Sequence, residues 1–195
     1  MAIETAIPDD FDPDKTSPDY DPCGEGRHHV AVVSVNENGK NGSVIVDFEV
    51  LASSGAGNEG KTHREFFSTK YTAMWKLLRF AMAVGIITAE EIKQMKERGE
   101  NPVLDLENDA VGKQLHIKTT TDNYDPTRPR QTCGSSIFHL ADERCRDWPK
   151  HEEFAKAAGV TVTEKSKAAR NSDQPNAAPA EPPQAIADDF LDGVV

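Results

Sequence analysis

The strongest constraint on the fold is the period-2 pattern of apolar side chains in Ser43–Leu51. Every second side chain there is apolar, and Asp47 and Glu49 lie in between. The apolar members are Val44, Val46, Phe48 and Val50. Because successive side chains of a strand point to opposite faces, this period predicts a half-buried antiparallel strand. The chain must therefore build a sheet that covers a core with one face.

Four more segments predict strands. His29–Val35 is rich in β-branched residues, and the Asn- and Gly-rich residues 36–42 predict a hairpin turn into the alternating strand. Residues 61–68 predict a third strand, polar enough for one face to meet solvent or a ligand. Residues 111–121 predict a fourth strand, and residues 135–140 a short fifth strand. In the fourth, we expect Leu115, Ile117 and Thr119 to point inward and His116, Lys118 and Thr120 outward.

Between the third and fourth strands the apolar period becomes helical. The spacing of Met74, Leu77, Leu78, Ala81 and Met82 predicts a helix over about 71–86, with Tyr71 and Trp75 in the core. Thr88 and Glu91 form a capping-box pattern flanked by Ile87 and Ile92, which predicts a second helix from about 89 to Gly99. A further helix is expected over about 149–158, ending at Gly159.

This order of elements predicts a mainly β fold. Five short strands with a helical insertion between the third and fourth are typical of a five-stranded OB-type barrel, here over residues 23–160. An unrelated small sheet with packed helices is the alternative.

The charge lies at the two ends of the chain. The net charge is -11, from 33 acidic and 22 basic residues. Residues 1–22 hold seven acids and one lysine, residues 171–195 hold five acids and no base, and the part between them holds 21 of each. We expect 1–22 to be an extended acidic arm and 161–195 to be a disordered linker and acidic tail.

The cysteine count and the hydropathy pattern limit the class of protein. Three cysteines without a signal peptide predict free thiols in a cytoplasmic protein, and no apolar run is long enough to span a membrane. A zinc knuckle needs a tight pair of cysteines, which Cys23, Cys133 and Cys145 do not form. We therefore expect no metal and no cofactor.

The order of several short motifs resembles one protein family. They are Tyr20-Asp-Pro22 with Gly26, Phe48-Glu-Val-Leu51, Gly60–Phe66, Leu77-Leu-Arg-Phe80 with Val84-Gly85, and Val111-Gly-Lys-Gln-Leu115. Together they resemble the phage-encoded single-stranded-DNA-binding proteins with an OB-fold, over about residues 20–140. The resemblance implies sequence-independent binding of single-stranded DNA in phage replication, recombination or repair, in the cytoplasm of an infected bacterium.

The resemblance implies that DNA binds to cations and aromatic rings on the face of strands 2 and 3 and in the loops between strands 1 and 2 and between strands 4 and 5. The candidate DNA-binding residues are Lys40, Arg64, Phe66, Lys118, Tyr124, Arg128 and Arg130. Of the neighbours Phe66 and Phe67, one should enter the core, and we expect Phe66 to face the DNA. The 4–5 loop, with Tyr124, Arg128 and Arg130, carries the best signal; a solvated charged turn is its alternative.

The acidic end of the chain resembles the partner-docking tails of bacterial single-strand-binding proteins. The candidate docking residues are Asp188, Asp189, Phe190, Leu191 and Asp192, although the chain ends in Gly-Val-Val and lacks the Pro-Phe tip of those tails. This likeness implies replication or recombination proteins as partners. We also expect the tail to compete with DNA for the groove.

Other classes of function have less support. Phosphate-loop, nucleophile-elbow and zinc-protease motifs are absent from the sequence, so we expect no enzyme. The stronger alternative is an OB module that binds proteins and no nucleic acid. The sequence leaves a homodimer open.

Overall fold

The structure is a computed structural model, and it describes residues 22–38, 42–122, 130–170 and 172. The predicted N-terminal arm, apart from Pro22, lies outside the described residues, and so do residues 173–195 of the predicted tail. Three candidate DNA-binding residues, Lys40, Tyr124 and Arg128, also lie outside them.

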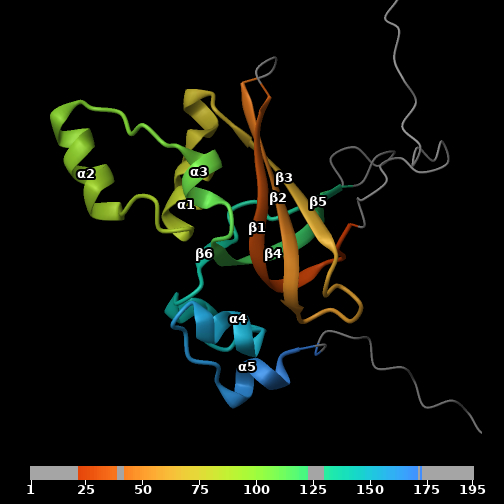
Figure 1. Cartoon of the computed structure of the whole chain (residues 1–195). Helices are drawn as coiled ribbons and strands as arrows, with labels where there is room; N and C mark the ends of the chain where they lie inside the picture. The colour runs from red at the N-terminus through yellow and green to blue at the C-terminus, as the bar shows by residue number, and fades with distance from the viewer. Residues whose placement is uncertain (1–21, 39–41, 123–129, 171, 173–195) are drawn as a thin grey trace, which may run out of the picture.

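The centre of the fold is one antiparallel sheet (Figure 1). The first three strands form a meander, and β4 then returns beside β1, so that the order along the sheet is β3-β2-β1-β4-β5, with β6 also paired to β4. The bounds are β1 Gly26–Asn38, β2 Ser43–Ser53, β3 Thr62–Ser68, β4 Gln114–Asp122, β5 Arg130–Thr132 and β6 Ile137–His139. The prediction of a mainly β fold is confirmed.

The sheet differs from the predicted five-stranded barrel in two respects. It has six strands, and within the described residues no strand ladder joins β3 to β5, so closure into a barrel is not shown. The predicted fifth strand, residues 135–140, is realised as β6, and β5 is a further short strand that was not predicted. A turn separates these two strands: Ser136 donates to the Cys133 carbonyl at 2.8 Å, and Gly134 has φ 50°. Arg130 therefore lies in β5 and not in a loop.

The alternation in β2 sets the buried face as predicted. Val46 and Phe48 are fully buried while Glu49 is exposed. The prediction that side chains of β4 point outward is confirmed for Lys118 and Thr120 and is wrong for His116. His116 is fully buried because the segment after β6 covers it: its Nε2 lies 3.3 Å from the Pro149 carbonyl, and its ring packs against Trp148 at 5.7 Å between centroids.

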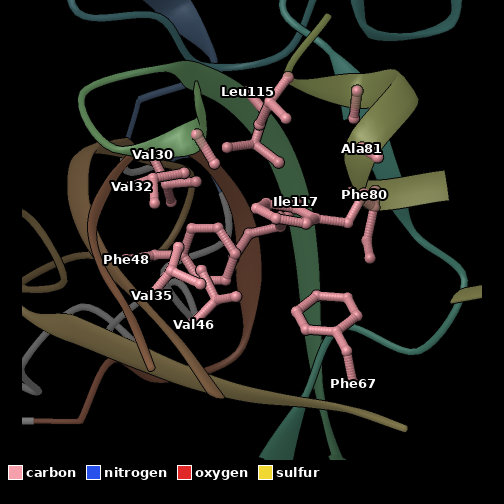
Figure 2. Packing of buried hydrophobic residues seen from close by; sticks show 14 of the residues in the cluster. Val30, Val32, Val35, Val46, Phe48, Phe67, Phe80, Ala81, Leu115 and Ile117 are labelled. Carbon is pink, nitrogen blue, oxygen red and sulfur yellow. The ribbon is translucent and has the colours of Figure 1, made fainter. Parts of the chain in front are cut away.

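The core lies between the sheet and α1 (Met74–Ala83). Figure 2 shows Phe80 of α1 reaching toward Ile117, with Phe48 among the valines of β1 and β2. Phe80 meets Phe48 at 5.9 Å and Phe67 at 5.0 Å between ring centroids. Three aromatic rings from three elements thus tie α1 to the sheet.

The helical insertion matches the prediction in part. The predicted helix over 71–86 is a 3-10 turn at Tyr71–Ala73 followed by α1, and Phe80, outside the predicted apolar set, is its most buried large side chain. Tyr71 and Trp75 are exposed, so their prediction as core residues is wrong. A short helix, α3 (Leu106–Ala110), was not predicted.

Helix α2 (Ala89–Arg98) confirms the predicted capping box. The Glu91 amide donates to Thr88 Oγ1 at 3.2 Å, and the Thr88 amide donates to Glu91 Oε2 at 2.8 Å. The helix ends at Gly99, whose φ of 69° is the left-handed conformation that glycine adopts at little cost.

The segment after β6 packs below the sheet in Figure 1 and contains α4 (Glu152–Ala157) and α5 (Glu164–Ala168). Helix α4 covers the middle of the predicted helix. Helix α5 lies within the start of the predicted linker. Thr163 caps this helix by accepting from the Ser166 amide at 3.1 Å. Among the described helices, none has both the length and the apolar composition that crossing a membrane requires.

Candidate functional site

A cavity of about 580 Å³ opens between β3 and β5. Its lining comes from four parts of the chain that are far apart in sequence. The lining residues are Pro22, Cys23, Arg64, Glu65, Phe66, Thr121, Arg130 and Gln131. We call this the β3–β5 cavity. It brings together three of the seven candidate DNA-binding residues, Arg64, Phe66 and Arg130.

Strand β3 supplies the ring and one cation of the cavity. Its side chains alternate, so Arg64 and Phe66 lie on the exposed face while Phe67 is fully buried. Phe66 is 44% exposed, which confirms that Phe66, and not Phe67, points out of the core. An exposed aromatic ring beside a cation is the arrangement on which a nucleic-acid base can stack.

The cation Arg64 is held by a carboxylate on the neighbouring strand. Arg64 and Asp47 are directly opposite in the β2–β3 ladder, and the guanidinium donates to Asp47 at 2.7 Å from Nε and at 3.1 Å from Nη2. Burial raises the pKa of Asp47, but hydrogen bonds from Arg64 and from Ser34 outweigh it, so that the pKa is lowered. This pair fixes the guanidinium at the cavity and reduces its net charge.

Strand β5 supplies the second cation. Arg130 is exposed, and its Nε lies 3.8 Å from Asp122 Oδ2, a looser pair than that of Arg64. Its neighbour Gln131 donates to Thr121 Oγ1 at 3.0 Å, which holds the amide against β4. Arg130 is therefore the more loosely paired of the two guanidinium groups at the opening.

A buried carboxylate, Glu65, forms the inner wall of the cavity. It is 3% exposed and accepts hydrogen bonds from the Cys133 amide at 2.6 Å, from Lys76 Nζ at 2.8 Å and from His63 Nε2 at 3.2 Å. Burial raises the pKa of Glu65, but His63, Lys76 and the Cys133 amide together lower it well below its usual range. Glu65 thus stays ionised and joins β3 to the end of β5.

The remaining candidate residues do not join this site. Lys118 is exposed on β4 but is not among the residues that line the cavity. Lys40, Tyr124 and Arg128 lie outside the described residues, and so do the candidate docking residues Asp188–Asp192. The best sequence signal, the 4–5 loop, is therefore represented in the site by Arg130 alone.

Sequence reasoning missed the polar interior of the site, namely Glu65, Thr121 and Gln131. One signal was present for Glu65. It lies two positions from Phe67 on the same strand, so its carboxylate must point to the same inward face as that core phenylalanine. No comparable signal identified Gln131, because β5 was not predicted, and none marked Thr121 at the end of the predicted fourth strand.

A scan against models of known protein families finds no match to this chain, and a search of curated proteins finds no similar sequence.

Proposed function

We propose that this chain binds single-stranded DNA without sequence preference, at the β3–β5 cavity. The observation that carries the proposal is the meeting of Arg64, Phe66 and Arg130 at one opening. In this proposal a base stacks on Phe66 while the two guanidinium groups contact the adjacent phosphates. Thr121 and Gln131 line the same opening and add hydrogen-bonding groups.

The proposal includes an OB-type fold, which is a partly open barrel. Two observations support it. The first is the strand order, in which β1 lies between β2 and β4 and helices α1–α3 fall between β3 and β4. The second is the contact between β3 and β5, where Glu65 accepts from the Thr132 hydroxyl at 3.3 Å and from the Cys133 amide. The cavity then lies where such a barrel is open.

The local charge limits the strength of binding. Both arginines face carboxylates, Asp47 and Asp122, so a phosphate competes with these for the guanidinium groups. We expect modest affinity that falls steeply with salt, because each phosphate contact releases counterions.

The test is fluorescence anisotropy with a labelled oligothymidylate of about 30 nucleotides, long enough for several site sizes of an OB-fold. We expect salt-sensitive binding to this single strand and little binding to a duplex of the same length. Phe66→Ala should weaken binding by about 1–3 kcal/mol, the contribution of one stacked base. Arg130→Glu should also weaken binding and reduce its dependence on salt.

Matched control variants are available on the same chain. Phe154 on α4 is 43% exposed, close to Phe66, so Phe154→Ala removes an equally exposed ring outside the site. Arg98→Glu reverses an exposed cation on α2, which lies well away from β5 in Figure 1. Absence of binding at about 50 mM salt, a condition in which phosphate contacts are strong, would contradict the proposal.

A second candidate is a protein-interaction module that binds no nucleic acid. An apolar groove of about 390 Å³ between α1 and β6 favours it, because Trp75 and Met82, 52% and 37% exposed, lie there beside Phe138. The oligonucleotide titration separates the two candidates, since this module predicts no binding of either strand form.

The wider setting of the first proposal rests on the sequence resemblance. In that setting, the chain protects single-stranded DNA during phage DNA replication, recombination or repair in an infected bacterium. The acidic residues Asp188–Asp192 would dock partner proteins of those processes and compete with DNA for the β3–β5 cavity.

A further inference from the structure

Three side chains of kinds that bind transition metals meet beside the β3–β5 cavity. His63 and Glu65 lie on the inward face of β3, and Cys133 directly follows β5. Their donor atoms all lie within 4.8 Å of one another, and the three residues are 1%, 3% and 3% exposed. A buried imidazole, carboxylate and thiol at one point form an unusual group for a hydrophobic core.

The spacing of two of these donors is close to that in a tetrahedral metal site. With bonds of about 2.0–2.3 Å to nitrogen, oxygen and sulfur, tetrahedral ligands lie about 3.3–3.8 Å from each other. His63 Nε2 and Glu65 Oε2 are 3.2 Å apart, close to that range. The two residues are separated by one position on a strand, which places both side chains on the same face without any distortion.

The donors are also held in place by their surroundings. The His63 ring stacks on Phe48, with 6.1 Å between centroids. The second carboxylate oxygen of Glu65 accepts from Lys76 Nζ at 2.8 Å and from the Thr132 hydroxyl at 3.3 Å. Such outer contacts orient a metal ligand. The oxygen nearest His63, Oε2, is itself positioned by the Cys133 amide, which donates to it at 2.6 Å.

We propose that His63, Glu65 and Cys133 bind one zinc-type transition-metal ion that links β3 to the end of β5. A thiolate with an imidazole and a carboxylate selects Zn²⁺ over Mg²⁺ or Ca²⁺, which take oxygen ligands. Glu65 also lines the β3–β5 cavity, so a water molecule from the cavity completes the fourth position. On binding, Cys133 releases its thiol proton to solvent, and the His63 ring carries its hydrogen on Nδ1 instead of Nε2. The metal then takes the place of the hydrogen bond between His63 Nε2 and Glu65.

This metal site does not depend on DNA binding. It concerns the inward face of β3, whereas the proposed DNA contacts Arg64 and Phe66 lie on the outward face of the same strand. The ion would hold together the two strands that carry Arg64, Phe66 and Arg130.

The experiment is a cobalt titration of the full chain, reduced and stripped of metal with a chelator. We expect one Co²⁺ per chain, with a near-ultraviolet thiolate-to-cobalt band and the visible bands of tetrahedral cobalt. Zn²⁺ should remove all of these bands, because it binds N and S ligands more tightly than Co²⁺. If the wild-type chain shows no thiolate-to-cobalt band, the proposal is overturned without recourse to any variant.

Two variants assign the ligand. Cys133→Ser should abolish the thiolate-to-cobalt band, whereas Cys145→Ser, which alters another fully buried free thiol, should keep it. Persistence of the band in Cys133→Ser would overturn the assignment. His63→Gln, checked for folding by circular dichroism, should weaken cobalt binding by about 10-fold or more, and unchanged binding would remove His63 from the site.

Discussion

Two buried histidines, His29 and His116, connect the sheet to the segment that follows β6. The ring nitrogen Nδ1 of His29 accepts from the His151 amide at 3.1 Å, and its Nε2 lies 3.0 Å from the Gln114 side-chain oxygen. An acceptor nitrogen carries no proton, so this geometry requires a neutral ring with its hydrogen on Nε2. Protonation would break the contact with the His151 amide.

Burial sets the titration of both rings. It lowers the pKa of His29 from 6.5 to about 4, and it lowers the pKa of His116 well below its ordinary value. The charged and titratable groups around the pair are Lys150, His151 and Asp142. The ammonium of Lys150 acts in the same direction as burial, because it repels a second positive charge.

The first prediction at this scale is a loss of stability in mild acid. In the unfolded chain His29 takes up a proton near pH 6.5, whereas in the folded chain it does so only near pH 4. The unfolded state therefore binds more protons in this window, and stability falls as the pH falls. His29 alone should cost about 3 kcal/mol between pH 6.5 and 4, measured by urea unfolding at each pH.

The control for this prediction is the exposed His139, on β6. His139→Gln should keep the pH dependence of the wild type, whereas His29→Gln should reduce it across the same window and leave the part that arises from His116. Equal slopes for His29→Gln and the wild type would show that the acid sensitivity arises elsewhere.

At the scale of elements, α2 depends on its N-terminal cap and on few core contacts. It has no fully buried side chain, so its capping box and the contacts of Ile92 and Met95 with the core carry much of its stability. This explains why α2 was predicted accurately. Its signals lie within a few residues of each other and do not depend on distant parts of the chain.

Thr88→Ala tests the contribution of this cap. The change leaves the Glu91 amide without its acceptor and should destabilise α2 by about 1 kcal/mol. Hydrogen exchange of the α2 amides measures this locally. Thr72→Ala, an exposed threonine in the 3-10 turn before α1, is the control, and faster exchange of α2 in that variant as well would argue against a specific cap effect.

At the scale of the whole molecule, the excess of acidic residues lies in residues 1–22 and 171–195. Helix α5 belongs to the folded part: Ser166 is fully buried and donates to the Arg146 carbonyl at 2.8 Å, and Arg170 pairs with Glu59. Residues 181–195 can therefore be removed without touching α5. They carry four acids and no base.

Removal of residues 181–195 tests the proposed competition between this segment and DNA. The shortened chain should bind oligothymidylate severalfold more tightly at low salt, and the gain should vanish at about 1 M salt, where the screening length is only about 3 Å. A full-length variant with Asp188, Asp189 and Asp192 changed to Asn should show the same gain. If affinity at low salt is unchanged by either alteration, the competition does not occur.

The sequence alone determined the features that depend on neighbouring residues. The period of β2 predicted which side chains enter the core, the parity of β3 separated Phe66 from Phe67, and Thr88 with Glu91 predicted the start of α2. These features follow from local geometry, because side-chain direction and capping are set within a few positions.

Only the tertiary structure decided the features that join distant segments. It buried His116 beneath Trp148, added β5 ahead of the predicted last strand, paired Arg64 with Asp47, and brought Cys133 to His63 and Glu65. The physical reason is that each of these depends on strand register and on packing between segments. The same polar side chain is exposed or buried according to what the rest of the chain lays over it.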